Sequence, residues 1–112
     1  MLKISKDGQR LYDAMAKYEI QHTGQFKRDL KSAKKSNFPL SDLFEIIDLL
    51  ENDEPLPEKC RNHILHGDYN GYWECHINPD WLLIYSKETI IRIITLYRTG
   101  THAKLFGKRK RK

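Results

Sequence analysis

The spacing of apolar side chains predicts two amphipathic helices in the first half of the chain. In the first segment, Phe26, Leu30 and Ala33 fall on one helical face. The second segment follows the i, i+3, i+4, i+7 pattern with Leu43, Ile46, Ile47 and Leu50. Each helix therefore has one apolar face to bury, and the two are expected to pack against a common partner.

Polar residues and prolines mark the predicted ends of these helices. Thr23 and Ser41 are the expected N-caps, because a hydroxyl oxygen can accept a bond from an unpaired N–H of the first turn. Pro39 ends the first helix, since the residue before a proline disfavours helical geometry. Pro55 and Pro57 end the second.

After Asn62 the apolar period changes to that of β-strands. The predicted strands are "NHILHG", "GYWECHIN", "WLLIYSK" and "TIIRIITLYR". Turns are expected at Asn78-Pro79-Asp80 and near Lys87–Glu88. The segment "TIIRIITLYR" is rich in β-branched residues and nearly all apolar, which indicates a central strand buried on both faces.

The order of these elements predicts an α+β fold. A short strand around Tyr18 and Ile20 comes first, then the two helices, then the run of strands. Such an order favours a compact domain in which a helical pair packs on one face of a largely antiparallel β-sheet.

The composition fits a single small domain of a cytoplasmic protein. The chain has 112 residues, 39% apolar and 31% charged. No apolar run approaches the roughly 18 residues of a membrane span, and the first ten residues lack the apolar core of a signal peptide. Cys60 and Cys75 are expected to be reduced thiols, with Cys75 buried.

The domain organisation follows from the two ends of the chain. Residues 1–14 are weakly patterned and precede a second methionine, so they are interpreted as an N-terminal extension to a domain at 15–107. Residues 108–112 form a basic C-terminal tail, which would strengthen binding to RNA through phosphate contacts.

The charges of the domain itself are separated along the chain. The net charge is +5, yet without the tail 15 basic residues balance 15 acidic ones. Segment 26–35 carries five basic residues and one acid, and segment 42–58 carries seven acids and no Lys or Arg. These segments are either two solvated helix faces that attract each other, or a cationic face for nucleic acid beside an acidic helix.

The strand half of the chain concentrates residues that can move protons and hold a phosphate. They are His63, Glu74, His76, Asp80, Arg98 and His102. Imidazoles exchange protons near neutral pH, and arginine binds phosphate with a two-pronged fork. RNA supplies its own nucleophile, the 2′-hydroxyl. The set therefore predicts acid–base cleavage of an RNA phosphodiester, with no cofactor.

Structural roles and a zinc site are the alternatives for the same residues. His22 and His66 are interpreted as structural, and Trp81 could simply pack in the core. Cys60, His63 and His66 have ligand-like spacing. However, adjacent strand residues point to opposite faces and no C-x-x-C pair occurs, so no metal site is predicted.

Three longer motifs carry a resemblance to a known family. The stretches "HILHGDYNGYWECHINPDWLLIY" and "YRTGTHAKLFG", preceded by "YEIQHTGQFKRDLKSAKK", resemble the YafQ branch of the RelE/ParE toxin superfamily, from Tyr18 to Gly107. The resemblance implies a compact sheet with helices on one side. It also implies a bacterial mRNA interferase of a type II toxin–antitoxin system, cutting mRNA in the ribosomal A site without a metal.

The resemblance also assigns roles. The residues implied to be catalytic are His63, His76, Asp80, Arg98 and His102. His102 is the expected general acid, Asp80 or His76 the expected proton acceptor, and Arg98 the phosphate ligand. Glu74, Trp73, Trp81 and Phe106 are expected to contact substrate. Trp73 stands where relatives often carry arginine, which could weaken a phosphate contact.

The implied partners are a cognate antitoxin protein, mRNA and the ribosome, with operator DNA reached only through the antitoxin and no membrane. Two other functions fit the same fold. One is a catalytically weak relative that binds RNA or the ribosome, and the other is a ParE-like toxin acting on DNA gyrase. Three histidines and Asp80 favour the nuclease, because a gyrase poison needs no proton-transfer groups.

Overall fold

A computed structural model describes residues 17–107 of the chain. The predicted N-terminal extension at 1–14 and the basic tail at 108–112 lie outside the described residues.

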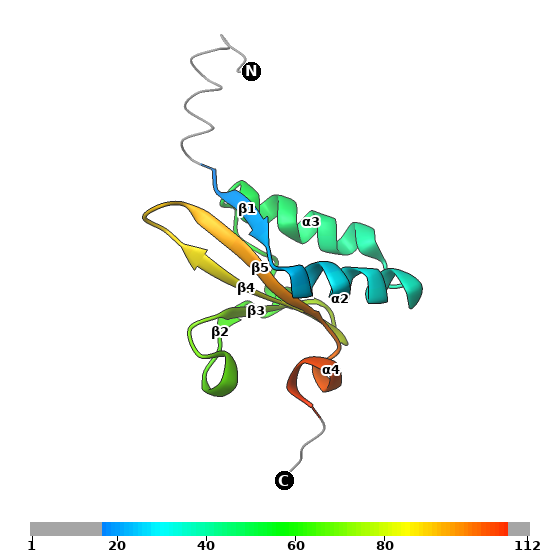
Figure 1. Cartoon of the computed structure of the whole chain (residues 1–112). Coiled ribbons are helices and arrows are strands. Elements are labelled where there is room, and N and C mark those ends of the chain that lie inside the picture. The colour runs from blue at the N-terminus through cyan, green and yellow to red at the C-terminus, as the bar shows by residue number, and fades with distance from the viewer. Residues whose placement is uncertain (1–16, 108–112) are drawn as a thin grey trace.

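Within residues 17–107, five strands form one twisted sheet in the order β1-β5-β4-β3-β2 (Figure 1). The strands are β1 (Glu19–His22), β2 (His63–Ile64), β3 (Trp73–Asn78), β4 (Trp81–Glu88) and β5 (Ile93–Gly100). Only the β1–β5 pair is parallel, and the other three pairs are antiparallel. This confirms the predicted largely antiparallel sheet.

Two helices, α2 (Gly24–Lys35) and α3 (Leu40–Glu51), cover one face of this sheet (Figure 1). A short helix, α4 (His102–Phe106), follows β5, and its Leu105 packs against Leu82 and Ile84 on the face of the sheet that α2 and α3 leave open. Single turns η1 (Glu58–Cys60) and η2 (Gly67–Tyr69) flank β2. The predicted α+β fold with a helical pair on one face is confirmed.

The helix starts were predicted with mixed success. Thr23 is the N-cap of α2: its Oγ1 accepts a bond from the N–H of Phe26 at 2.9 Å. The prediction for Ser41 is wrong, because α3 begins at Leu40 with Pro39 as its N-cap. A proline at a helix start removes no hydrogen bond of the helix, because the first backbone N–H groups have no partner inside the helix.

The two faces of the sheet carry separate apolar clusters. The main core lies between the sheet and the helices, and it contains Phe26, Leu43, Cys75, Leu83 and Tyr85 among others. A smaller cluster on the open face is built on Leu82, Ile84 and Leu105. Successive side chains of β3 and β4 therefore point to opposite faces of the sheet, as in any β-strand.

The strand that is buried on both faces is β4, not β5. Residues Trp81–Tyr85 of β4 are all buried, whereas buried and half-buried positions alternate along most of β5. β5 also starts later than predicted, because Ile90 and Ile91 lie in the turn and are 93% and 65% exposed. Apolar composition alone could not locate that turn, which is closed by Arg92 at a φ of 58°.

Candidate active site

A buried carboxylate lies between two imidazoles on the open face of the sheet. His63 of β2 pairs with Glu74 of β3, and His76 follows two residues later, so all three side chains leave the same face. Glu74 Oε1 lies 3.2 Å from His63 Nε2 and 3.7 Å from His76 Nε2. We call these three residues the His–Glu–His group.

Burial makes this contact chemically significant. Glu74 is only 6% exposed, and a carboxylate removed from water is stable as an anion only when charged or hydrogen-bonding groups compensate it. His63 Nδ1 also lies 2.6 Å from the carbonyl oxygen of Arg61. Because a carbonyl only accepts, Nδ1 must donate, and Nε2 can then donate to Glu74 only when the ring is fully protonated.

Arg98 lies in the same row of the sheet but is held by a residue that the sequence analysis missed. Glu74 pairs with Ile84, and Ile84 pairs with Arg98. The guanidinium turns to α2, where Nε donates to Asp29 Oδ2 at 2.7 Å and Nη2 donates to Asp29 Oδ1 at 3.1 Å. Arg98 is therefore a paired cation and not a free one.

The environment of Asp29 keeps it ionised. Burial alone would raise the pKa of this carboxyl, but hydrogen bonds from Arg98, Gln25 and the backbone of Thr99 outweigh burial and hold the pKa below its ordinary value of 3.8. In return, the bond to Asp29 raises the pKa of Arg98. The sequence contained one signal: Asp29 is the lone acid of the cationic segment, three residues after Phe26 and four before Ala33, on the face that α2 buries.

His102 begins α4 and stacks on an aromatic residue of the same helix. The rings of His102 and Phe106 lie 4.7 Å apart, inclined by 30°. Phe106 in turn meets Tyr69 edge-on at 5.2 Å, and the Tyr69 hydroxyl donates to the carbonyl of Leu105. His102 itself is exposed, so this stack presents an imidazole to solvent from a fixed support.

Asp80 is exposed in the β3–β4 turn and makes local contacts. Its backbone N–H donates to Asn78 Oδ1 at 3.0 Å, which fixes the turn. Leu82 pairs with Gly100, so the β3–β4 turn and the residues that follow β5 lie at the same end of the sheet. The topology thus brings Asp80 and His102 to one end, together with His76 in the row of Leu82 and Gly100.

Two of the predicted substrate contacts are placed elsewhere. Trp81 is 1% exposed and packs edge-on against Phe38 with ring centroids 5.0 Å apart, so the prediction that its side chain contacts substrate is wrong. Trp73 packs against the main core on the helix-covered face. It points away from Glu74, and its position does not support a contact with substrate beside the His–Glu–His group.

A pocket opens at the edge of the sheet beside His76. It has a volume of about 390 Å³ and is lined by His76, Asn78 and Pro79 of the β3–β4 hairpin with Asp42, Lys59 and Arg61. The cationic side chains of Lys59 and Arg61 next to an imidazole suit a phosphate-bearing ligand.

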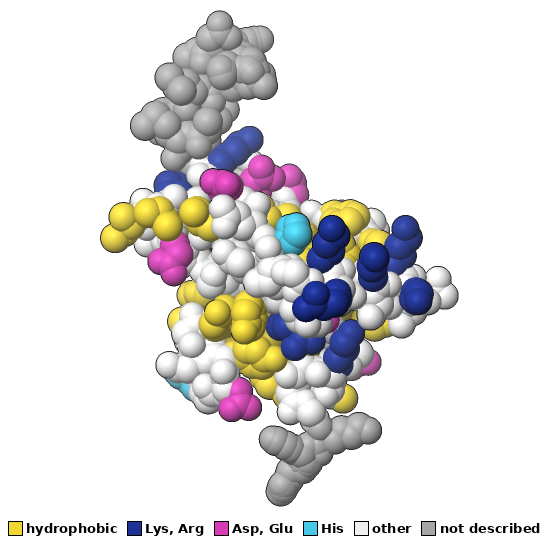
Figure 2. Space-filling model, in the orientation of Figure 1, with side chains coloured by type: hydrophobic (Ala, Val, Ile, Leu, Met, Phe, Trp, Pro, Cys, Tyr) yellow, Lys and Arg dark blue, Asp and Glu magenta, His cyan; other side chains and the backbone are white. Residues whose placement is uncertain are grey.

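The cationic segment forms one exposed surface. Lysine and arginine side chains gather over α2 (Figure 2). They are Lys27, Arg28, Lys31, Lys34 and Lys35, all exposed. None of the ion pairs among residues 17–107 joins α2 to α3. The geometry therefore does not support the interpretation as two mutually attracting helix faces.

The described residues contain no group of three or more His, Cys, Asp or Glu side chains that could hold a metal ion. The thiols of the alternative zinc site are buried: Cys60 is 1% and Cys75 0% exposed. Burial raises the pKa of both thiols, which opposes the thiolate form that a metal requires.

Among residues 17–107, no helix is long and apolar enough to cross a membrane.

Comparison with known proteins gives consistent matches. Residues 18–107 match the family described as "bacterial toxin of type II toxin-antitoxin system, YafQ". The mRNA interferase toxin YafQ of Escherichia coli K12 is 38% identical over 94 residues, which are 83% of this chain and 100% of that protein. The crystal structure of YafQ from E. coli BL21(DE3) covers 80% of this chain and 99% of its own, at 37% identity and a TM-score of 0.76.

A second kind of solved structure contains a partner. The toxin chain of the E. coli DinJ–YafQ toxin–antitoxin complex is 38% identical and has a TM-score of 0.74, covering 81% of this chain and 99% of that one. The fold is therefore shared with both free and antitoxin-bound relatives.

Proposed function

Because the chain belongs to the YafQ family of bacterial type II toxin–antitoxin toxins, we propose that it is an mRNA interferase, an endoribonuclease that cuts mRNA. We place this activity in the bacterial cytoplasm, at mRNA in the ribosomal A site. A cognate antitoxin is the proposed protein partner, by analogy with the DinJ–YafQ complex.

One observation carries the proposal: the buried carboxylate of Glu74 touches the imidazoles of both His63 and His76 on the open face of the sheet. The buried Glu74 side chain lies within ion-pair distance of both rings and can orient them, and imidazoles are the side chains most often used for proton transfer in catalysis. A gyrase-directed toxin has no use for such an arrangement, whereas cleavage of RNA needs one proton acceptor and one proton donor.

The reaction uses the 2′-hydroxyl of the nucleotide before the cut as nucleophile. His76 or Asp80 accepts the 2′ proton, and the oxygen attacks the adjacent phosphorus. His102, held on Phe106, donates a proton to the departing 5′ oxygen, while the N–H groups of Arg98 that Asp29 does not occupy stabilise the charge on phosphorus. The products are a 2′,3′-cyclic phosphate and a 5′-hydroxyl.

The proposal is tested by cleavage of mRNA on programmed ribosomes, with product ends mapped. Wild type is expected to cut, and His76→Ala and His102→Ala are each expected to lower the rate roughly 10²-fold or more. His22→Ala is the matched control, because the exposed His22 ring meets Thr23 and Phe26 and lies on β1, at the opposite edge of the sheet from His63. A chelator that binds Zn²⁺ but leaves the Mg²⁺ of the ribosome in place is expected to leave the rate unchanged.

Three outcomes would refute parts of this proposal. A wild-type protein that neither cuts mRNA nor arrests bacterial growth would refute the nuclease function. Cleavage by His102→Ala within a few-fold of wild type would remove His102 from the mechanism. Activity abolished by the zinc-selective chelator and restored by zinc would replace acid–base catalysis with a metal mechanism.

A further inference from the structure

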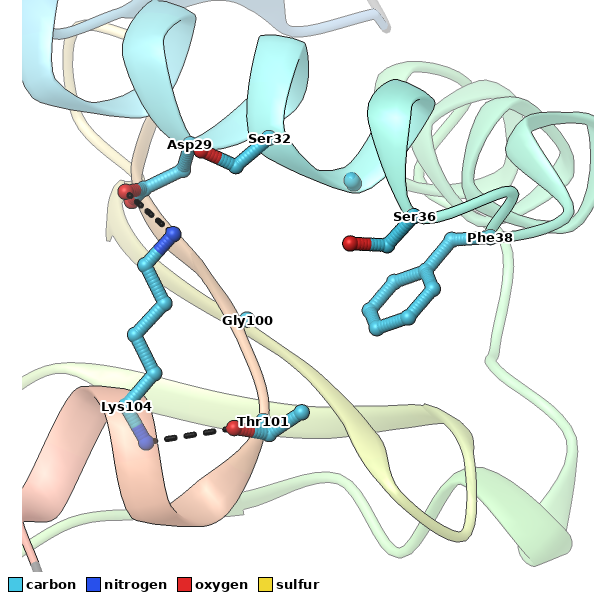
Figure 3. Close-up of a pocket in the computed structure, with 8 residues that line it drawn as sticks. Asp29, Ser32, Ser36, Phe38, Gly100, Thr101 and Lys104 are labelled. Atoms are coloured by element: carbon cyan, nitrogen blue, oxygen red, sulfur yellow. Dashed lines mark hydrogen bonds and ion pairs between the residues drawn. The ribbon is translucent and has the colours of Figure 1, made fainter.

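The buried carboxylate of Asp29 accepts hydrogen bonds from three different residues. Its two oxygens accept bonds from Arg98, from the backbone N–H of Thr99 at 3.2 Å and from Gln25 at 3.1 Å. The ammonium of Lys104, on α4, lies 3.7 Å from Oδ1 (Figure 3). One carboxylate, 1% exposed, thus joins α2 to β5 and α4.

The geometry of the Arg98 pair leaves part of the guanidinium available. Asp29 occupies the edge formed by Nε and Nη2, and Nη1 takes no part in this bidentate bond. The Tyr69 side chain is a second hydrogen-bond partner of the guanidinium. The Arg98 side chain is 21% exposed, whereas the side chain of its anionic partner is 1% exposed. The result is a cation with a fixed orientation at the surface.

The position of Arg98 in the sheet explains why it needs such support. β1 ends at His22, which pairs with Leu96, so in the described part of the chain no strand lies beside β5 beyond Leu96 on that side. An arginine on an open strand edge has many rotamers, and fixing it costs conformational entropy before any substrate binds. The bidentate bond to Asp29 fixes it during folding instead.

We propose that Asp29 is a positioning residue for RNA cleavage, which holds the Arg98 guanidinium by its Nε and Nη2 groups and so directs Nη1 at the scissile phosphate. The inference rests on the proposed function and extends it to a residue outside the predicted catalytic set. Asp29 touches no substrate in this scheme and acts through Arg98. Lys104, 41% exposed on its side chain, shares the carboxylate and keeps the cluster of two cations and one anion positive overall.

Kinetics of a double-mutant cycle test whether Asp29 acts through Arg98. Asp29→Asn keeps the shape and one acceptor oxygen but loses the charge, and it is expected to lower kcat about 10- to 100-fold with a smaller change in KM, as for a misplaced catalytic group. In the Arg98→Ala background the same substitution is expected to change the rate by less than about twofold. Asp48→Asn, an exposed aspartate of α3, is the matched control.

The cycle distinguishes positioning from general stability. A folded Asp29→Asn protein with wild-type kcat would overturn the inference. So would an equal loss of rate with and without Arg98, because a purely structural role does not depend on that side chain.

A spectroscopic measurement needs no variant that might fail to fold. In ¹⁵N spectra of wild type, the Arg98 Nε–H signal is expected to be sharp and protected from exchange. Titration with a 2′-O-methyl RNA oligonucleotide, which cannot be cut, is expected to shift the Nη1 signals and leave Nε in place. A broad Nε signal, or one lost when RNA binds, would overturn the inference. A wild type that binds this RNA with the expected shifts but cuts no mRNA would refute the proposed function alone.

Discussion

Glu74 illustrates how burial changes the role of a single side chain. In the sequence it was one more acid near two histidines, and its expected role was substrate contact. At 6% exposure it has little surface to offer a substrate, and both of its ion-pair partners are imidazoles. It therefore acts on the two rings, whose orientation depends on its charge.

Glu74→Gln is expected to lower mRNA cleavage about 10-fold or more, because a neutral amide holds two imidazoles less firmly than a carboxylate does. Single-turnover cleavage on programmed ribosomes measures the effect. Glu45→Gln is the control, since Glu45 is an exposed residue of α3. Equal loss in both variants would contradict a specific role for Glu74.

Which side chains of the candidate site share a face was predictable from the sequence only where they lie on one strand or on neighbouring strands. Glu74 and His76 follow from the period of two in one strand, and His63 from the expected neighbouring strand. Asp29 was missed because it meets Arg98 across 69 positions, and no local pattern records such a contact. Trp81 was misassigned for the opposite reason: the family motif contains it, and only the packing on Phe38 shows that it belongs to the core.

Trp81→Ala tests this correction. Removing a fully buried indole is expected to reduce the free energy of unfolding by about 3–5 kcal/mol, through lost contacts and the cavity that remains. Urea denaturation followed by circular dichroism measures it. Ile90→Ala, at a position 93% exposed, should stay within about 0.5 kcal/mol of wild type. A near-neutral Trp81→Ala with impaired RNA binding would restore the original assignment.

At the scale of elements, the helix α2 is fixed to the sheet at its N-cap. The Thr23 hydroxyl accepts from the N–H of Phe26 and donates to the carbonyl of Tyr97 at 2.9 Å, so one side chain caps a helix and links it to β5. The sequence predicted the cap from residue type alone. The link to Tyr97 depends on the parallel β1–β5 pair, which the strand pattern did not reveal.

Thr23→Ala is expected to destabilise the protein by about 1–2 kcal/mol, the usual cost of losing an N-cap. Ser41→Ala is the matched control, because Ser41 follows the true start of α3, and it should cost less than about 0.5 kcal/mol. Urea unfolding curves of both variants give the comparison. Similar losses in the two would contradict the assigned caps.

At the scale of the whole molecule, the response to acid should depend on Asp29. Its pKa in the folded protein lies below the ordinary value of 3.8, because bonds from Arg98, Gln25 and Thr99 outweigh the effect of burial. A lowered pKa stabilises the fold above the ordinary value, and that contribution disappears as the pH falls below 3.8.

Wild type should therefore lose more stability between pH 6 and pH 3 than Asp29→Asn does, as measured by urea unfolding at each pH. The other carboxylates titrate in both proteins, so the difference isolates Asp29. Parallel pH profiles of the two would show that this carboxylate contributes no acid-sensitive stability.

The bond between Asp29 and the N–H of Thr99 has a consequence for self-association. Past the end of β1 a sheet of this kind exposes a row of amides onto which another polypeptide could add as an extra strand. Here the backbone N–H of Thr99 already donates to the Asp29 side chain of α2. Another polypeptide that approached this edge could not form a hydrogen bond with that N–H group. The Asp29 carboxylate therefore removes one of the backbone donors to which an added strand could bind at this edge of the sheet.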